Sequence, residues 1–231
     1  MGIWQRFTRL LGDGALAMGG LIERVGALLG GDPEERRHMA FSIAMVALSA
    51  KMAKADGVVT FDEVAAFRRL VSVSEGEARY VDRLFNLARR DVAGYQSYAL
   101  KIAALYEADD PILSDIVEGL FGIATADRVV HEAELDYLAD VAQLFGLSAD
   151  AFDRIKVRHV EAAESDPYRI LGAARTMSFD ELRLAYRRLV AEHHPDRLMA
   201  RGVPPEFITL ANHRMATINV AWERIERERR G

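Results

Sequence analysis

Apolar residues recur every three to four positions along most of this 231-residue chain, which is the spacing of one face of an α-helix. Residues 33–163 contain no stretch in which apolar and polar residues alternate, as they would in a half-buried strand. Pro33 and Pro111 each follow an aspartate, an order typical of a helix start because aspartate caps the helix and proline fits its first position. The pattern therefore predicts an all-α domain of about seven helices over this range.

A helical hairpin is predicted near the C-terminus. Ser178 and Glu181 form a capping box at the start of one helix, and Pro195 should end it. The apolar stripe of this helix consists of Phe179, Leu182, Tyr186 and Leu189. The last helix begins at Pro204-Pro205, and its stripe consists of Phe207, Leu210, Ala211, Ile218, Ala221, Trp222 and Ile225. A short helix over residues 166–172 should pack across the pair, and the stripes then bury one another.

The connection between these two helices carries the tripeptide His194-Pro195-Asp196. We expect a loop that displays His194, Asp196, Arg197 and Arg201 to solvent. An ordinary turn would also contain proline and aspartate, but the predicted helices on both sides favour a specific role. On the preceding helix, Arg183 and Arg187 lie four residues apart and share a face, with Arg188 beside them. This face could bind an acidic partner or could simply be solvated.

Residues 166–227 resemble a J domain, the module through which DnaJ-type co-chaperones bind DnaK. The matching residues are Asp166, Tyr168, Ile170-Leu171-Gly172, Ala185-Tyr186-Arg187-Arg188-Leu189, His194-Pro195-Asp196-Arg197, Ile218 and Ala221. The resemblance implies binding to the nucleotide-binding domain of a DnaK-type chaperone and acceleration of its ATP hydrolysis. It assigns the trigger to His194, Pro195 and Asp196, with Arg197 beside them, and docking to the three arginines. Leu184 and Glu192 depart from the pattern, because basic residues are common there.

An internal repeat lies in the middle of the chain. Residues 53–63 align without gaps with residues 124–134, at an offset of 71. The repeated residues resemble the TerB family of tellurite-resistance-associated domains, and the order TerB-like then J is that of DjlA-type proteins. The family resemblance implies a divalent-metal site, which carries over to Asp56, Glu63, Asp127 and Glu134. The same two glutamates could instead complete capping boxes with Thr60 and His131.

Composition narrows the choices further. The chain has no cysteine, which excludes disulfides and thiol catalysis, and no P-loop, dinucleotide motif or nucleophile–base set, so we expect no enzyme. Residues 1–165 carry a formal charge of −8 and residues 166–231 one of +3. This acidic bulk argues against nucleic acid as a partner. We expect three parts: an amphipathic segment (1–31), a TerB-like domain (32–163) and a J domain (164–231).

The first 31 residues have apolar positions at helical spacing, interrupted by glycines and charges. The longest uncharged run, Gly14 to Ile22, has nine residues, whereas a membrane span needs about 20. We therefore predict no transmembrane helix and no signal peptide. Residues 1–31 could lie in a membrane surface with Trp4 and Phe7 inserted. Alternatively, they could form a helix that packs on the domain or on a partner, or a frayed tail, and we favour this non-membrane alternative. The expected location is cytoplasmic, with peripheral contact at the inner membrane and homodimer formation left open.

Two functions fit these observations. We favour a co-chaperone that stimulates the ATPase of a DnaK-type chaperone through the His-Pro-Asp loop. The alternative is a stress-linked adaptor or sensor whose acidic TerB-like domain binds a divalent cation or a partner protein. No cofactor is certain from the sequence.

Overall fold

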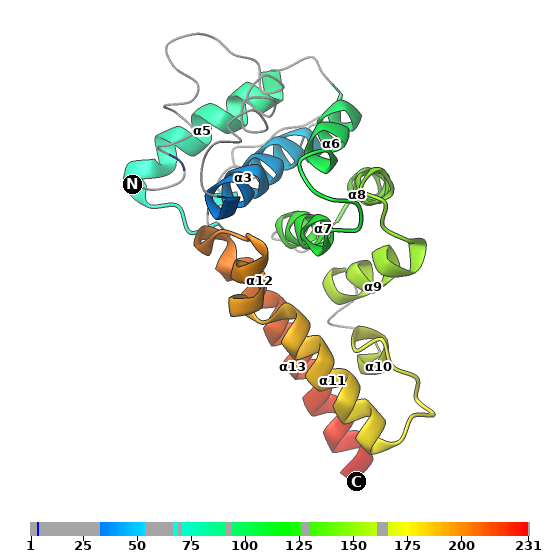
Figure 1. Cartoon of the computed structure of the whole chain (residues 1–231). Coiled ribbons are helices and arrows are strands. Elements are labelled where there is room, and N and C mark those ends of the chain that lie inside the picture. Colours follow the sequence, from blue (N-terminus) through cyan, green and yellow to red (C-terminus); the bar gives the residue numbers. More distant parts are fainter. Residues whose placement is uncertain are drawn as a thin grey trace.

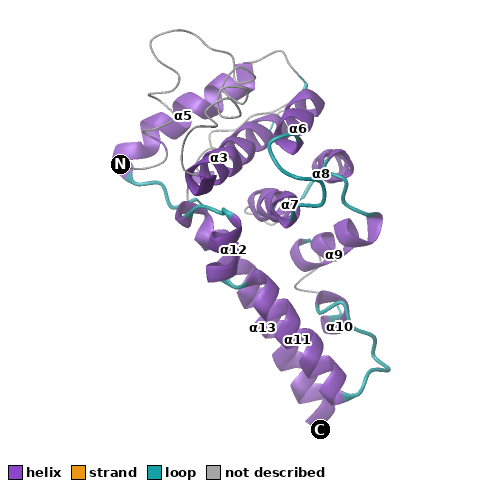
Figure 2. Ribbon diagram, viewed as in Figure 1, coloured by secondary structure: helices purple, strands orange, loops and turns teal. Residues whose placement is uncertain are grey.

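The computed structural model describes Trp4 and residues 33–53, 67–68, 71–90, 94–125, 130–160 and 166–230. Every regular element within these ranges is a helix, as Figure 2 shows, so the all-α prediction is confirmed for the described part of the chain. Most of the repeat at residues 53–63 and 124–134, and the segment 1–31 apart from Trp4, lie outside the described residues.

The N-terminal body of the molecule, which we call the helical domain (33–160), is a bundle in which α3 occupies the centre (Figure 1). Its helices are α3 (Pro33–Met52), α5 (Glu75–Arg90), α6 (Tyr95–Ala103), α7 (Pro111–Ala124), α8 (Glu132–Leu144) and α9 (Ala149–His159). Helix α3 is buried from Met39 to Met52 because α5, α6 and α7 all pack against it. Its apolar residues thus form the middle of the larger core.

Helix α7 begins as the sequence predicts. The side chain of Asp110 accepts a hydrogen bond from the backbone N–H of Ile112 at 3.1 Å, and Pro111 occupies the first turn. Nearly all residues of this helix are buried, including two acids, Asp115 and Glu118. An apolar helix of this kind packs on several sides at once, and α7 contacts α3, α8, α9, α12 and α13.

The C-terminal hairpin (166–230) consists of α10 (Pro167–Ile170), α11 (Phe179–His193), α12 (Pro195–Arg201), the 3-10 turn η1 (Pro205–Phe207) and α13 (Ile208–Arg230). Figure 1 shows α11 and α13 side by side, extending away from the bundle. The predicted capping box forms, because the hydroxyl of Ser178 accepts from the backbone of Glu181 and the glutamate accepts in return. Tyr186 stacks on Trp222 with ring centroids 4.9 Å apart, so both belong to the packing of the hairpin.

The prediction of a loop after His194 is wrong in one respect, because residues 195–201 form the helix α12. Pro195 ends α11, as expected, but it also occupies the first turn of α12, and His194 serves as the N-cap. Arg201 at the far end of α12 is not displayed to solvent as predicted. Its side chain is 19% exposed and forms an ion pair with Asp115 of α7. A proline fits a helix start as well as a turn, so the tripeptide alone did not distinguish the two.

The larger hydrophobic core includes residues of the C-terminal hairpin. Leu198, Val203, Phe207, Leu210 and Ala211 are buried in it together with the helices of the helical domain. Phe207 packs edge-on against Phe41 of α3 at 5.0 Å and against the buried ring of Trp4 at 6.0 Å. We call residues 193–214 the tip of the hairpin. Trp4, which the sequence left between membrane and protein, packs against protein here.

Candidate functional site

The His-Pro-Asp turn lies at the start of α12, on the surface of the tip. The Nδ1 atom of His194 accepts a hydrogen bond from the backbone N–H of Asp196 at 3.2 Å. Because Nδ1 accepts, it carries no proton, and the neutral ring has its proton on Nε2. The side chain of His194 is 51% exposed and that of Asp196 is 81% exposed. The turn therefore presents one donor and one carboxylate acceptor, held at a helix N-terminus.

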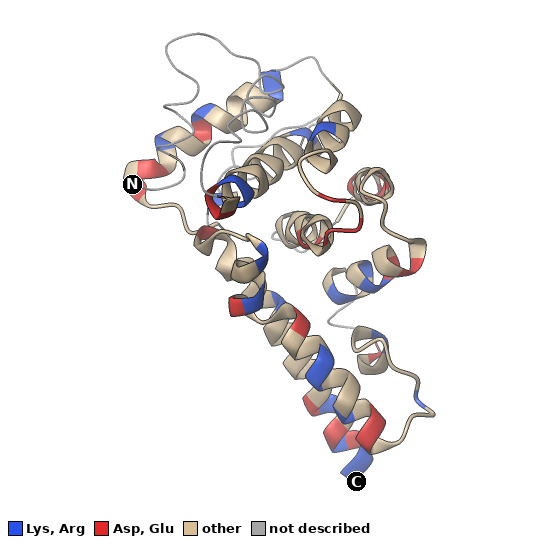
Figure 3. Cartoon of the chain, in the orientation of Figure 1, with Lys and Arg blue, Asp and Glu red and all other residues tan. Residues whose placement is uncertain are grey.

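The predicted basic face lies on the outer side of α11. Arg183, Arg187 and Arg188 are exposed, and so is Arg197 on α12. Figure 3 shows basic residues along α11 and α12 interspersed with acidic ones, so the hairpin, like the bundle, carries both signs of charge. Arg183 forms an ion pair with Asp180 at 3.0 Å. Leu184 lies within this face and is 70% exposed, so the face has an apolar position where a further basic residue was expected.

A second set of charged residues, which we did not predict from the sequence, lies where the tip packs against α7 and α9. Glu118 of α7 is buried and forms ion pairs with Arg158 of α9 and with Arg214 of α13, whose Nε lies 2.9 Å from Oε2. His159 contacts the same carboxylate through Nε2 at 2.8 Å. Arg214 also donates from Nη1 to Nδ1 of His193 at 2.9 Å. A chain of contacts thus runs from α7 to the residue that precedes His194.

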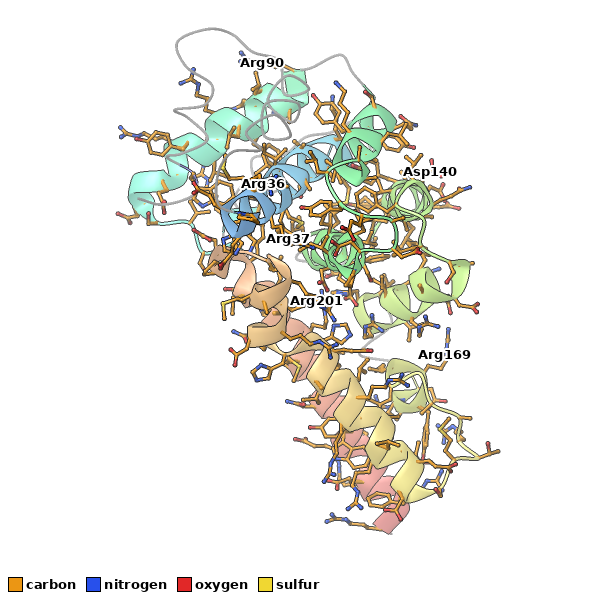
Figure 4. The ribbon with its side chains drawn as sticks, viewed as in Figure 1. Arg36, Arg37, Arg90, Asp140, Arg169 and Arg201 are labelled. Carbon is orange, nitrogen blue, oxygen red and sulfur yellow. The ribbon has the colours of Figure 1, made fainter. Side chains whose placement is uncertain are left out.

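A second carboxylate of α7 holds the other end of α12. Oδ2 of Asp115 lies 3.3 Å from Nη1 of Arg201, and Oδ1 lies 3.7 Å from Nη1 of Arg214. From α3, Nε of Arg37 donates to the carbonyl of Arg201 at 3.0 Å. Figure 4 labels Arg37 and Arg201 at the place where α3, α7 and α12 meet. We call Asp115, Glu118, Arg158, Arg201 and Arg214 the ionic cluster.

Burial and charge act in opposite directions on the acids of the ionic cluster. Burial opposes ionisation of Glu118, but the charges of Arg158 and Arg214 and the hydrogen bond with His159 outweigh it and hold its pKa well below the ordinary value. Burial raises the pKa of Asp115, although Arg214 and Arg201 oppose this shift. Removing one partner from such a buried set costs about 3–5 kcal/mol, because the remaining charge is left unpaired.

Both histidines next to the ionic cluster are neutral. Burial lowers the pKa of His193 to about 3, and the charges of Arg214, Arg158 and Arg201 act in the same direction, against an opposing effect of Glu118. Burial also lowers the pKa of His159, against the hydrogen bond to Glu118, which raises it. The geometry agrees, because an arginine can only donate and Nδ1 of His193 must therefore be free of a proton.

The sequence did contain a signal for the ionic cluster. Asp115 and Glu118 are the acids of an otherwise apolar helix, and they lie three residues apart on one face. A buried carboxylate pair requires cationic partners, so this pattern predicts that arginines reach α7 from elsewhere. It does not say from which segment, because Arg158, Arg201 and Arg214 are distant in sequence.

The structure does not test the predicted metal site as a whole. Asp56, Glu63 and Asp127 lie outside the described residues. Glu134 accepts a hydrogen bond from the backbone N–H of His131 at 2.9 Å, which is the capping role that the sequence offered as the alternative. No group of three or more potential ligands gathers within the described ranges. The metal site stays a prediction, and a shift of the melting temperature on addition of Ca²⁺ or Mg²⁺ would test it.

Among the helices that are described, none is long and apolar enough to span a membrane.

Comparison with known proteins identifies both parts of the chain. The family of the tellurite resistance protein TerB matches residues 42–157, and the DnaJ domain matches residues 166–230. No solved structure matches the chain.

Known co-chaperone proteins are similar to this chain, two of them over most of their own length. Co-chaperone protein DjlA of Aliivibrio fischeri is 25% identical over an alignment 234 positions long, gaps included, which covers 87% of this chain and 82% of that protein. The protein of the same name from Photobacterium profundum is 26% identical and covers 84% and 80%. That from Vibrio cholerae is 32% identical over a shorter stretch, 46% of this chain and 48% of the relative.

Fold and comparisons together define an all-α protein in which a TerB domain precedes a J domain. The chain belongs to the TerB family, in the DjlA-type arrangement with the J domain at the C-terminal end. The resemblance of the sequence to DjlA-type proteins is therefore confirmed. The C-terminal hairpin is the J domain, and the helical domain is the TerB domain.

Proposed function

We propose that this protein is a co-chaperone that stimulates ATP hydrolysis by a DnaK-type chaperone through the His194-Pro195-Asp196 turn. The observation that carries the proposal is the exposure of His194 and Asp196 beside the arginines of α11. The J-domain match and the co-chaperone relatives support it. The protein would act without chemistry of its own, by changing the conformation of its partner.

Two parts of the surface would divide the work. Arg183, Arg187 and Arg188 lie on a rigid helix and would attract an acidic patch of the chaperone, which raises the rate of encounter. The turn would then make the specific contacts. The ring of His194 would donate from Nε2, because its Nδ1 is engaged with the backbone of Asp196, while the carboxylate of Asp196 would accept.

A single-turnover ATPase assay with a purified DnaK-type chaperone tests the proposal. We expect wild-type protein to accelerate hydrolysis and His194→Gln to abolish the acceleration. His131→Gln, the same change at an exposed histidine that precedes α8, is the matched control and should retain activity. No acceleration by wild-type protein, or full activity in His194→Gln, would refute the proposal.

A second substitution separates partner contact from helix capping. His194 is the N-cap of α12, and asparagine is a preferred N-cap. His194→Asn should therefore keep α12 folded but lack the reach of the imidazole. We expect loss of stimulation with unchanged helical content and melting temperature, measured by circular dichroism. Retained stimulation would mean that the cap alone is needed.

A further inference from the structure

The His-Pro-Asp turn is attached on its N-terminal side to the TerB domain. His193 directly precedes the turn and is buried, and its Nδ1 accepts from Arg214 at 2.9 Å. Arg214 in turn lies 2.9 Å from the carboxylate of Glu118, which α7 supplies. Arg158 and His159 of α9 hold that carboxylate from the other side. The end of α11 therefore cannot shift relative to α7 without breaking the buried hydrogen bond between His193 and Arg214 or the ion pairs that hold Arg214.

The other end of α12 is attached to the TerB domain independently. Arg201 pairs with Asp115, and its carbonyl accepts a hydrogen bond from Arg37 of α3. The helix ends at Gly202, whose φ of 104° suits glycine. A Cβ atom at this position would lie 2.6 Å from Cβ of Arg37, so the backbone approaches α3 more closely than another residue allows.

Between these two attachments, α12 buries its apolar side in the core of the TerB domain. Leu198 is 2% exposed and belongs to the core cluster that contains α3 and α7. The exposed side of the same short helix begins with His194 and Asp196. One side of α12 is thus fixed to the TerB domain while the opposite side presents the turn to solvent.

We infer that the TerB domain is a structural part of the J-domain site. Asp115 and Glu118 act through Arg201, Arg214 and His193 to hold α12, and so fix the direction in which His194 and Asp196 face the chaperone. These are positioning residues, because none of them needs to touch the partner. The inference rests on the proposed function and adds to it a role for α7.

The physical benefit is pre-organisation. A seven-residue helix has too few internal hydrogen bonds to be stable by itself, so its orientation must come from packing. If α12 were mobile, the chaperone would have to order it on binding, and each ordered segment reduces the free energy available for the productive complex. Holding α12 in place beforehand avoids that cost. The arginines of α11 lie on a separate helix surface and should work without the ionic cluster.

Glu118→Gln in the full-length chain is the first test, with Asp82→Asn as the matched control because Asp82 forms an ion pair with Arg68 away from α12. We expect maximal stimulation of the DnaK-type ATPase to fall about tenfold in Glu118→Gln, because a mobile α12 would present the turn in the productive direction only about a tenth of the time. The half-saturating concentration should change less than about threefold, because the arginines that steer encounter are untouched. Equal loss in the control would indicate a general effect of instability.

Hydrogen exchange provides a readout that does not depend on the chaperone. The amides of α12 should exchange faster in Glu118→Gln, while those of α10, which lies at the other end of the J domain, keep their wild-type protection. Unchanged protection of α12 would overturn the inference even if stimulation were lost. The control Asp82→Asn should leave both helices as in the wild type.

Two substitutions of His193 address the case in which Glu118→Gln does not fold. His193→Asn retains an acceptor for Arg214 through its amide oxygen, whereas His193→Leu removes the acceptor and leaves Arg214 paired with Glu118. We expect His193→Asn to keep most of the maximal stimulation and the protection of α12, and His193→Leu to lose both. Equal behaviour of the two variants would overturn the positioning role.

The outcomes separate the inference from the proposed function. If wild-type protein gives no stimulation, the proposed function fails, and protection of α12 in Glu118→Gln still decides whether the TerB domain holds this helix. If wild-type protein stimulates and His194→Gln does not, but both Glu118→Gln and His193→Leu retain full stimulation, the proposed function stands and the inference fails.

Discussion

The two ends of the J domain are built on different principles. At the end away from the TerB domain, which we call the base, α10, α11 and α13 enclose a core of their own that includes Tyr168, Leu182, Trp222 and Ile225, joined by Val157 of α9. At the tip, Leu198, Val203 and Phe207 belong to the core of the TerB domain. The end that carries the His-Pro-Asp turn is therefore the end that depends more on the TerB domain for its core.

The arginines of the J domain show the same contrast. Arg187 and Arg188 point to solvent, where a charge contributes little to stability and remains available to a partner. Arg214 is buried between two carboxylates, where it stabilises the fold and is not accessible to a partner. The residue type is the same, and the surroundings decide whether it recognises a partner or holds the two domains together.

The largest expected effect comes from removing the aromatic ring that joins the tip to α3. Phe207→Ala should lower the free energy of unfolding by about 3–5 kcal/mol, because it leaves a cavity beside Phe41 and Trp4. Hydrogen exchange should increase in α3 and α7, although the substitution lies in the J domain. Ile225→Ala at the base should instead increase exchange in α10, α11 and α13. An effect of Phe207→Ala confined to the J domain would contradict the shared core.

A glycine at each end sharpens the comparison. Gly202 at the tip has φ 104° and Gly172 at the base has φ 62°. Alanine in such a conformation costs about 1–3 kcal/mol at either position. At Gly202 the new Cβ would also meet Arg37 at 2.6 Å, whereas the nearest atom at Gly172 lies 3.7 Å away. Gly202→Ala should therefore be the more destabilising in urea denaturation, and equal effects would argue against close contact at the tip.

Acid should weaken the tip before the base. The pKa of His193 is lowered to about 3 in the folded protein, so below its ordinary value only the unfolded chain takes up the proton. Stability is therefore lost as the pH falls from about 6.5, and His193 alone contributes a loss of about 2 kcal/mol by pH 5. His159 acts in the same direction and Asp115 in the opposite one. Urea denaturation should show a shallower pH dependence in His193→Asn than in the wild type.

The smallest effect on stability is expected on the outer face of α11. Arg187→Gln should change the free energy of unfolding by less than about 0.5 kcal/mol, because the residue is exposed. It should nevertheless weaken the interaction with a DnaK-type chaperone and make it less sensitive to salt. Binding measured at two ionic strengths checks both points. A large loss of stability would show that the outer face contributes to the fold.

Local signals predicted the elements of this protein well. The capping box at Ser178, the cap at Asp110 and the end of α11 before Pro195 lie where the sequence placed them. These features depend on neighbouring residues, so they can be predicted from local sequence. The helix α12, which begins at Pro195, was not predicted, because a proline next to an aspartate fits both a turn and a helix start.

The sequence by itself determined that the chain is all-α, that a TerB domain precedes a J domain, and that α11 ends at the His194-Pro195-Asp196 motif. Periodicity and motifs are properties of neighbouring residues, so local sequence is enough to reveal them. Only the tertiary structure decided that Arg201 and Arg214 turn inward, and that α12 lies against α7 and α3. The partners of Asp115 and Glu118 lie as far as 99 residues away along the chain, between Asp115 and Arg214. Pairing over such distances follows from how whole helices pack, which no local pattern specifies.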